Sequence, residues 1–349
     1  MADRENGKPM KTDAMFRICS MTKPVTSVAV MMLYEEGRLM LEDPLSKYLP
    51  EFKDAKVYVV PATGATYSIP VTREIMIRDL LRHTSGLTYQ WNPVLGPMYG
   101  KANVASGILP YDGTIADSVK QLAGLPLLFN PGDRWEYGLS ADVLGRVIEV
   151  VSGQTLDEFF RERIFKPLGM NDTYFYPPDD KLSRLATVYT YFPEKGLNRF
   201  PDKPIVDGTF SYGVDYPYTP PRKLFSGGAG LVSTVGDYAR FCEMLLNKGK
   251  VGSTQLLSPK TIEMMTHDQL GSISPEHGFG LGFGLEGVKA PLDEAGTPGE
   301  FDWYGFYYTS FFVDPKEQMI VIFMAQLHPE GGLRLNRQVD VLAHQALIE

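Results

Sequence analysis

The last third of the chain changes its hydrophobic pattern from helical to strand-like, and no other feature limits the possible folds so strongly. An amphipathic helix is predicted over 235–249, and apolar runs follow it. The predicted strand-like runs are 278–287, 301–314 and 318–326, with DPKEQ as the tight link between the last two. A final helix is predicted from about Arg334 to Ile348. A sheet behind a helical middle is typical of the α+β class, which we expect to form two subdomains.

Helical patterns dominate the part of the chain before this sheet. Apolar residues recur at three- and four-residue spacing from Ser20 onward, and Gly37 ends this helix. The other segments with a helical pattern are 72–87, 115–125 and 139–168. Two short strands are predicted within 56–71, around a turn at Thr63-Gly64. Residues 170–222 show little periodicity and are predicted to form a long irregular segment, whose tyrosines argue against disorder.

Composition and charge restrict the classes of function. The 349 residues are 44% hydrophobic and 22% charged, as in ordinary globular proteins. A net charge of −8 without any basic run argues against a nucleic-acid partner. No apolar run approaches the ~20 residues that span a bilayer, and the polar first residues do not resemble a signal peptide. Five scattered histidines and two cysteines, Cys19 and Cys242, give no metal-ligand or disulfide pattern. We therefore expect free thiols in a reducing cytoplasm, and neither a metal nor a cofactor.

A Ser-x-x-Lys sequence at the start of the first helix is the main candidate for catalytic chemistry. On a helix, Ser20 and Lys23 lie on the same face, with Cβ atoms ~5–6 Å apart. A serine hydroxyl is a poor nucleophile unless a base removes its proton, and lysine can do so only when burial or a nearby positive charge keeps it neutral. The alternative is a helix-capping serine beside a solvated lysine, and the motif alone does not decide between the two.

Two further segments carry residues suited to such a site. Tyr137 stands at the start of the apolar helix in 135–153, where its hydroxyl can donate and accept a proton. Gly305 interrupts the aromatic run 299–315, which indicates close approach of another backbone or of a ligand. The other common serine-hydrolase signature, Gly-x-Ser-x-Gly, does not occur in the sequence.

Five segments in this order resemble the serine β-lactamase-related superfamily, nearest to class C β-lactamases, D-alanyl-D-alanine peptidases and family VIII carboxylesterases. The segments are FRICSMTKPVTSVAVMMLYEEGRLMLEDPLSKYLPEF, IRDLLRHTSGL, YGLSADVLGRVIE, FSGGAGLVSTVGDYARFCEMLL and WYGFYYTSFFVDPKEQMIVIF. Together they extend over nearly the whole chain.

The resemblance implies a β-lactamase/transpeptidase-like α+β fold, with an antiparallel sheet flanked by helices and a mostly helical domain. We expect 1–70 and 225–349 to form the discontinuous sheet domain and 71–224 to form the helical domain, with the active site between them. Relatives carry a helix and two strands before the serine, which we expect to be missing here. The strand 318–326 would then be an exposed edge, and a homodimer contact is expected there.

The resemblance also implies roles for individual residues. Ser20 would attack an acyl carbonyl, Lys23 and Tyr137 would share the base and acid roles, and which of them is the base stays open. The backbone N–H groups of Ser20 and Phe306 would form the oxyanion hole. The residues expected to bind substrate are Trp303, Tyr304, Gly305 and Leu139.

Two nearby residues are expected to have structural roles. His83, in RHTSG, is read as structural. Asp142 is read as a structural or helix-surface residue.

Three departures from the family pattern bear on the substrate. Trp303 stands where β-lactamases carry Lys or His, so a substrate carboxylate loses its cationic partner. Aromatic residues at 304 and 306–308 would crowd the acyl site or the core of the sheet. Leu139 replaces the usual polar residue two places after the tyrosine. Arg222 and Lys223 could supply a cation from another direction.

We therefore expect a serine hydrolase for small, short-chain carboxylic esters. The alternatives are a weak β-lactamase or D-amino-acid peptidase or amidase, and a non-catalytic binding protein on the same scaffold.

Overall fold

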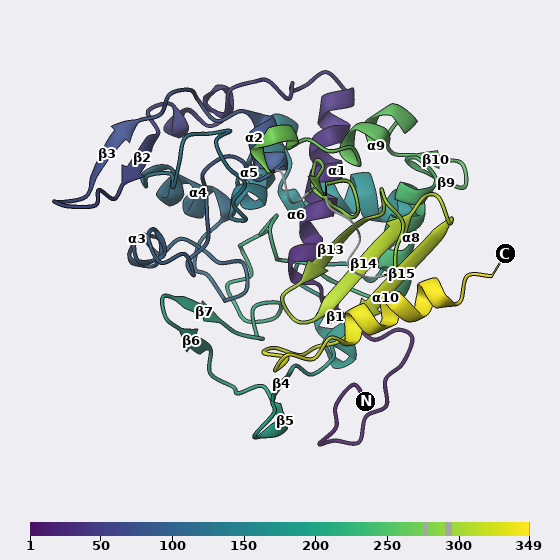
Figure 1. Ribbon diagram of the computed structural model, residues 1–349. Coiled ribbons are helices and arrows are strands. Elements are labelled where there is room, and N and C mark those ends of the chain that lie inside the picture. The colour runs from purple at the N-terminus through teal and green to yellow at the C-terminus, as the bar shows by residue number, and fades with distance from the viewer. Residues whose placement is uncertain (275–277, 290–294, 349) are drawn as a thin grey trace.

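The computed structural model describes residues 1–274, 278–289 and 295–348, and its largest sheet lies beside a cluster of helices (Figure 1). The α-helices are α1 (Thr22–Glu35), α2 (Ile77–Leu81), α3 (Gly96–Lys101), α4 (Ile115–Ala123), α5 (Ser140–Ser152), α6 (Leu156–Phe160), α7 (Lys166–Leu168), α8 (Val235–Leu246), α9 (Pro259–Met265) and α10 (Leu335–Gln345). The strands are β1 (Phe16–Arg17), β2 (Lys56–Val59), β3 (Tyr67–Pro70), β4 (Tyr189–Phe192), β5 (Gly196–Arg199), β6 (Ile205–Asp207), β7 (Phe210–Tyr212), β8 (Val232–Ser233), β9 (Lys250–Val251), β10 (Thr254–Gln255), β11 (Gly278–Phe279), β12 (Gly284–Leu285), β13 (Phe301–Gly305), β14 (Thr309–Asp314) and β15 (Met319–Met324). The expected α+β class is confirmed.

The main sheet is antiparallel, with the strand order β11-β12-β13-β14-β15. Successive side chains of a strand face opposite sides, so the neighbours Phe311 and Phe312 identify what covers each face. The Phe311 ring packs against Tyr238 of α8, and the Phe312 ring stacks on His344 of α10. Helices α8 and α10 therefore cover opposite faces of the sheet, as Figure 1 shows. Strand β15 ends the sheet, as expected for 318–326.

Helix α1 forms the centre of the core. Its residues from Thr22 to Leu33 are all buried, so it contacts protein on every side rather than along one apolar stripe. It packs along α5, which also contacts α2 and α4. The short hairpins β2–β3, β4–β5 and β6–β7 lie at the periphery of the fold (Figure 1).

The prediction for 301–314 is wrong in one respect that matters for the site. This run is not one strand but a hairpin, in which β13 and β14 pair with Gly305 opposite Thr309. The reversal lies at 306–308, where Tyr308 has a φ of 67° and its N–H donates to the Gly305 carbonyl at 3.0 Å. An aromatic residue in the left-handed region is uncommon, so residue preference did not reveal this turn.

Helix α2 is shorter than the helix predicted over 72–87, and the helix predicted over 139–168 is interrupted after α5, although helical structure reaches Leu168 as predicted. In the first, only α2 is helical, because the Asp79 carboxylate accepts the Met76 N–H and fixes the start of the helix. In the second, Gly153 has a φ of 76° and ends α5, after which Thr155 begins a new helix by capping the Glu158 N–H.

The segment 170–222 is less irregular than predicted, because it contains the hairpins β4–β5 and β6–β7. The division into domains at 70/71 and 224/225 stays a prediction. Within the described ranges, no helix has both the length and the apolar character needed to cross a membrane.

Candidate active site

Ser20 lies in a 3-10 turn, Cys19–Met21, that leads directly into α1. Lys23 follows in the first turn of that helix, and its Nζ lies 3.1 Å from the Ser20 Oγ. The predicted same-face geometry of the two residues is therefore confirmed. Cys19 is buried with its Sγ 3.7 Å from the Tyr216 hydroxyl, so its thiol packs in the core and not at the Ser20 hydroxyl. Both cysteines are free.

The amine of Lys23 is held inside the protein by three oxygen atoms. Its side chain is only 2% exposed, and Nζ donates to Ser20 Oγ, to the Tyr89 hydroxyl at 2.9 Å and to the Gly228 carbonyl at 2.7 Å. Burial lowers the pKa of Lys23 to about 7, although the negative charge of Asp142 opposes this shift. A substantial fraction of the amine is therefore neutral near pH 7, which is the form that can accept a proton.

Tyr137 contacts the same serine from the other side. Its hydroxyl donates to Ser20 Oγ at 2.6 Å, and Lys23 Nζ lies 4.6 Å from the centre of its ring. Burial raises the pKa of Tyr137 well above its ordinary value. Tyr137 therefore keeps its proton over the range in which Lys23 loses its own.

Tyr89 belongs to this group, and sequence reasoning missed it. The residue is buried, its hydroxyl accepts a hydrogen bond from Lys23, and Trp91 stacks on its ring at 4.2 Å. The available signal was its position directly after the RHTSGL segment, which resembles a family landmark. That segment was read only for His83.

Asp142 and the glycine turn fix the carbonyl that faces Lys23. One Asp142 oxygen accepts from the Ser226 hydroxyl at 2.5 Å and from the Gly228 N–H at 3.3 Å. A side chain at position 228 would collide with the Asp142 carboxylate, so only glycine fits there. Asp142 is buried, which excludes the helix-surface reading and agrees with a structural one.

His83 is buried among aromatic rings, with the Tyr137 ring 5.1 Å away. Burial, with a smaller effect from the Lys23 charge, lowers the pKa of His83 to about 3. The imidazole is therefore neutral and packs against Tyr137, which agrees with the structural reading.

The β13–β14 hairpin forms the opposite wall of the site. A side chain at Gly305 would collide with the carbonyl oxygen of Ile18, two residues before Ser20. The close backbone approach predicted for this glycine is confirmed. Phe306 follows at the turn, and its N–H donates to no acceptor within the described residues. This N–H is therefore free to bind an oxygen atom of a substrate.

The four residues expected to bind substrate do not all lie together. The Trp303 ring is 5.5 Å from that of Tyr137, and Tyr304, 58% exposed, stacks on Trp303 at 5.0 Å. Leu139 differs, because its side chain is 1% exposed and belongs to the hydrophobic core. The structure does not bring Leu139 to the open side of the site.

The two cations considered for a substrate carboxylate are engaged by carboxylates of the protein. Arg222 pairs with Asp179 at 3.0 Å, and Lys223 lies 3.7 Å from Asp112.

Comparison with known proteins identifies the family. The family model described as Beta-lactamase matches residues 1–345, and the chain belongs to that family. An uncharacterized protein of Mycobacterium tuberculosis (strain CDC 1551 / Oshkosh) is 35% identical over 342 residues, which cover 94% of this chain and 81% of that protein. Esterase EstB of Burkholderia gladioli is 34% identical over 346 residues, which cover 95% of this chain and 82% of EstB. The expected superfamily is confirmed.

A solved structure supports the fold at similar coverage. EstCE1, described as a hydrolase with promiscuous acyltransferase activity, has a TM-score of 0.80 and 29% identity. The match covers 98% of this chain and 87% of EstCE1.

Because the Lys23 amine is buried, we expect the unmodified protein to be less stable than a variant with an apolar residue at position 23. We expect Lys23→Met to raise the free energy of unfolding at pH 7 by about 1–3 kcal/mol, after the loss of the lysine's hydrogen bonds is subtracted. Between about pH 7 and the ordinary lysine pKa of 10.5, the unfolded chain binds a proton that the folded chain does not. Stability of the unmodified protein therefore rises with pH in this window, and the advantage of Lys23→Met shrinks.

Urea unfolding between pH 7 and pH 10 measures this difference. Lys101→Met, at an exposed lysine, is the matched control and should show little change at any pH. A Lys23→Met difference that stays constant with pH would mean that Lys23 has an ordinary pKa.

Proposed function

We propose that this chain is a serine hydrolase that cleaves short-chain carboxylic esters through an acyl-enzyme on Ser20. One observation carries the proposal. Ser20 Oγ lies 3.1 Å from Lys23 Nζ and 2.6 Å from the Tyr137 hydroxyl, two groups whose pKa values are shifted in opposite directions. Such a pair supplies an acceptor and a donor of protons around one nucleophile at the same pH.

The proton path follows from these positions. Neutral Lys23 takes the Ser20 proton as Oγ bonds to the substrate carbonyl carbon. The N–H groups of Ser20 and Phe306 stabilise the resulting oxyanion. Tyr137 then gives its proton to the leaving alkoxide and is reprotonated by Lys23. In the second half, water attacks the acyl-enzyme, and the same groups return the proton to Ser20, releasing the carboxylic acid.

The surroundings of the serine support a neutral substrate. Trp303, Tyr304 and Trp91 present aromatic rings near Tyr137, whereas Arg222 and Lys223 are held by carboxylates. An acyl chain can pack against such rings, whereas neither of these two cations is offered to a substrate carboxylate without competition from a protein carboxylate. The similarity to esterase EstB points in the same direction.

The nucleophile is tested by Ser20→Ala. We expect this variant to lose ester hydrolysis by several orders of magnitude, and to lose covalent labelling by a fluorophosphonate, because no other group replaces the attacking oxygen. The matched control is Ser27→Ala, which removes a buried serine farther along α1 and should keep activity within a few-fold. A folded Ser20→Ala protein that keeps more than about a tenth of the activity would refute the proposed role.

Substrate class is tested by comparing p-nitrophenyl butyrate with nitrocefin. We expect fast turnover of the ester and little of the β-lactam, whose carboxylate lacks a cationic partner. Trp303→Lys should raise the rate of nitrocefin hydrolysis, relative to that of the ester, by roughly ten- to a hundredfold, which is the contribution of one charge-assisted hydrogen bond. Trp303→Phe keeps an apolar ring and should leave this ratio of rates unchanged. Comparable wild-type rates on both substrates would instead favour the β-lactamase alternative.

We also propose that the free edge of β15 mediates a homodimer. Its six residues, Met319–Met324, are apolar and only half-buried, and the edge bears no Lys or Pro. A two-fold pairing of these edges would give their backbone N–H and C=O groups hydrogen-bond partners. It would also leave no free edge to which a third chain could add.

Sedimentation of the full chain tests the dimer. We expect a dimer at micromolar concentration, which Val321→Lys should weaken by placing like charges across the pairing. Val206→Lys, at an exposed valine of the peripheral hairpin β6–β7, is the control. A monomer whose strand 319–324 is protected from hydrogen exchange would show that the edge is covered within one chain.

A further inference from the structure

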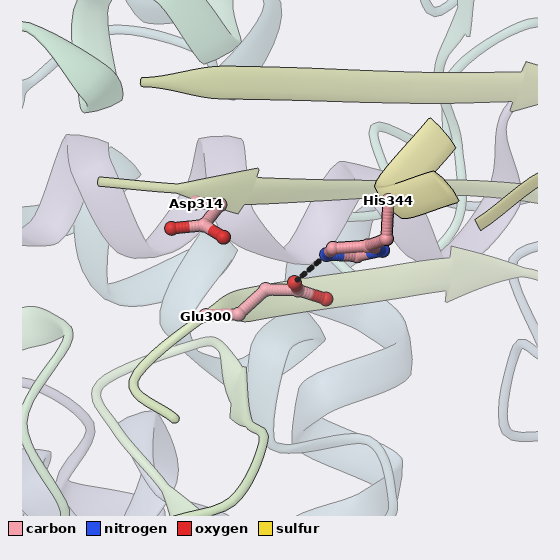
Figure 2. Close-up of side chains that lie close together, drawn as sticks. All are labelled: Glu300, Asp314 and His344. Atoms are coloured by element: carbon pink, nitrogen blue, oxygen red, sulfur yellow. Dashed lines mark hydrogen bonds and ion pairs between the residues drawn. The ribbon is translucent and has the colours of Figure 1, made fainter. Parts of the chain in front are cut away.

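Three side chains with metal-binding groups meet on the face of the main sheet that α10 covers (Figure 2). Glu300 directly precedes β13, Asp314 ends β14, and His344 lies in α10. One ligand atom from each lies within 4.8 Å of the others. Figure 2 shows the Glu300 and His344 side chains facing each other, with the Asp314 carboxylate beside them on a separate strand.

The His344 ring is oriented so that one of its nitrogens, Nε2, faces an oxygen of the Glu300 carboxyl group. Its Nδ1 is 2.9 Å from the carbonyl oxygen of Asp340, which can only accept, so this nitrogen carries the hydrogen. In the neutral ring, the Nε2 lone pair then faces Glu300 Oε2 at 3.1 Å. Two acceptors at that distance require a proton or a cation between them. A ring N–H bound to a carbonyl is also the usual support of a metal-binding histidine.

The hydrogen bonding of Asp314 favours a bound cation over a proton shared between His344 and Glu300. Its side chain is 0% exposed, and Oδ1 accepts the N–H groups of Lys316 and Glu317. Its Oδ2 is buried and has no hydrogen-bond partner. A single proton between His344 and Glu300 would satisfy that pair and leave Asp314 Oδ2 unpaired, which is costly in the interior. A cation bound by all three groups would satisfy every one of these atoms.

The surroundings provide a negative potential and an access path. The carboxylates of Asp314 and Asp340 place negative charge near Glu300. A cavity of about 580 Å³ between the sheet and α10 includes Glu300 and His344 in its lining, so an ion from solvent can reach them.

We propose that Glu300, Asp314 and His344 bind one divalent transition-metal ion, for which Zn²⁺ is the best match. One imidazole nitrogen and two carboxylate oxygens are ligands that zinc accepts, whereas calcium and magnesium prefer oxygen alone. Water would complete the coordination. Because zinc–ligand bonds are about 2.0–2.2 Å long, ligand atoms around a tetrahedral ion lie about 3.4 Å apart, so a pair near the present 4.8 Å limit must approach by about 1.4 Å when the ion binds.

The ion would connect α10 to the sheet. This helix contains no fully buried residue, so little apolar contact holds it against β15 and its neighbours. A metal bound by His344 and by residues at the ends of two strands would tie the helix in place. Trp303, by contrast, contacts Tyr137 on the other side of β13. The metal site is therefore structural and separate from Ser20.

Titration of the full chain with Zn²⁺ after chelator treatment tests this site. We expect saturable binding of one ion per chain by calorimetry, and a rise of several degrees in the unfolding temperature. Co²⁺ should give the visible absorption of a low-symmetry site, with changes from each ligand variant. Ester hydrolysis by the chelator-treated protein should be unchanged, which separates failure of this proposal from failure of the hydrolase proposal.

Two ligand variants and one control variant test the ligand set. Asp314→Asn and His344→Gln should each weaken Zn²⁺ binding by at least tenfold, since each removes a ligand. His267→Gln, at an exposed histidine elsewhere, is the matched control and should bind like the unmodified chain. Asp314→Asn keeps an oxygen that can accept the Lys316 and Glu317 N–H groups, so this variant should still fold and a loss of binding can be assigned to the missing ligand. Absence of saturable binding at micromolar Zn²⁺, or equal binding by all variants, would overturn the proposal.

Discussion

The burial of the Lys23 amine is the constraint on which the rest of the site depends. Removing a cationic group from water is costly, and the protein offsets this by surrounding Nζ with oxygen atoms from Ser20, Tyr89 and Gly228. Asp142 supplies a nearby negative charge, and it is itself buried. The result is an amine poised between its charged and neutral forms. A lysine in contact with water would remain charged and could not act as a base at neutral pH.

Aromatic packing keeps that environment dry and also determines the properties of Tyr137. The rings of His83, Tyr89 and Trp303 lie around the Tyr137 ring at 5.1–5.5 Å. The low polarity of this cluster lowers the pKa of a base and raises that of an acid, because it disfavours the charged form of both. One physical environment thus separates the two pKa values in the directions that nucleophilic catalysis requires.

The sequence predicted those parts of the site that depend on local geometry. The spacing of Ser20 and Lys23 placed them on one face of a helix, and Gly305 marked a close backbone approach. Tyr137 depended on the family resemblance, because nothing local says which tyrosine faces the serine. Tyr89 was missed for the same reason.

Tertiary contacts explain the other differences between prediction and structure. Glu300, Asp314 and His344 come from three elements, so no spacing along the chain indicates that they meet. The turn at 306–308 was missed because aromatic residues favour strands and conceal it. Leu139 was placed near substrate from its position alone, whereas its burial depends on how α5 packs.

The contact between Gly305 and Ile18 joins segments that lie far apart in the sequence, and it has a consequence for how the protein is made. The helix that carries Ser20 is synthesised well before its neighbours at Gly228 and Gly305. Until then, α1 exposes apolar sides that the finished protein buries completely. Ser20 is thus synthesised long before the residues that come to surround it. A nascent or shortened chain without the C-terminal strands would contain Ser20 and Lys23 but would lack the contacts that bury the Lys23 amine and distinguish it from an ordinary lysine.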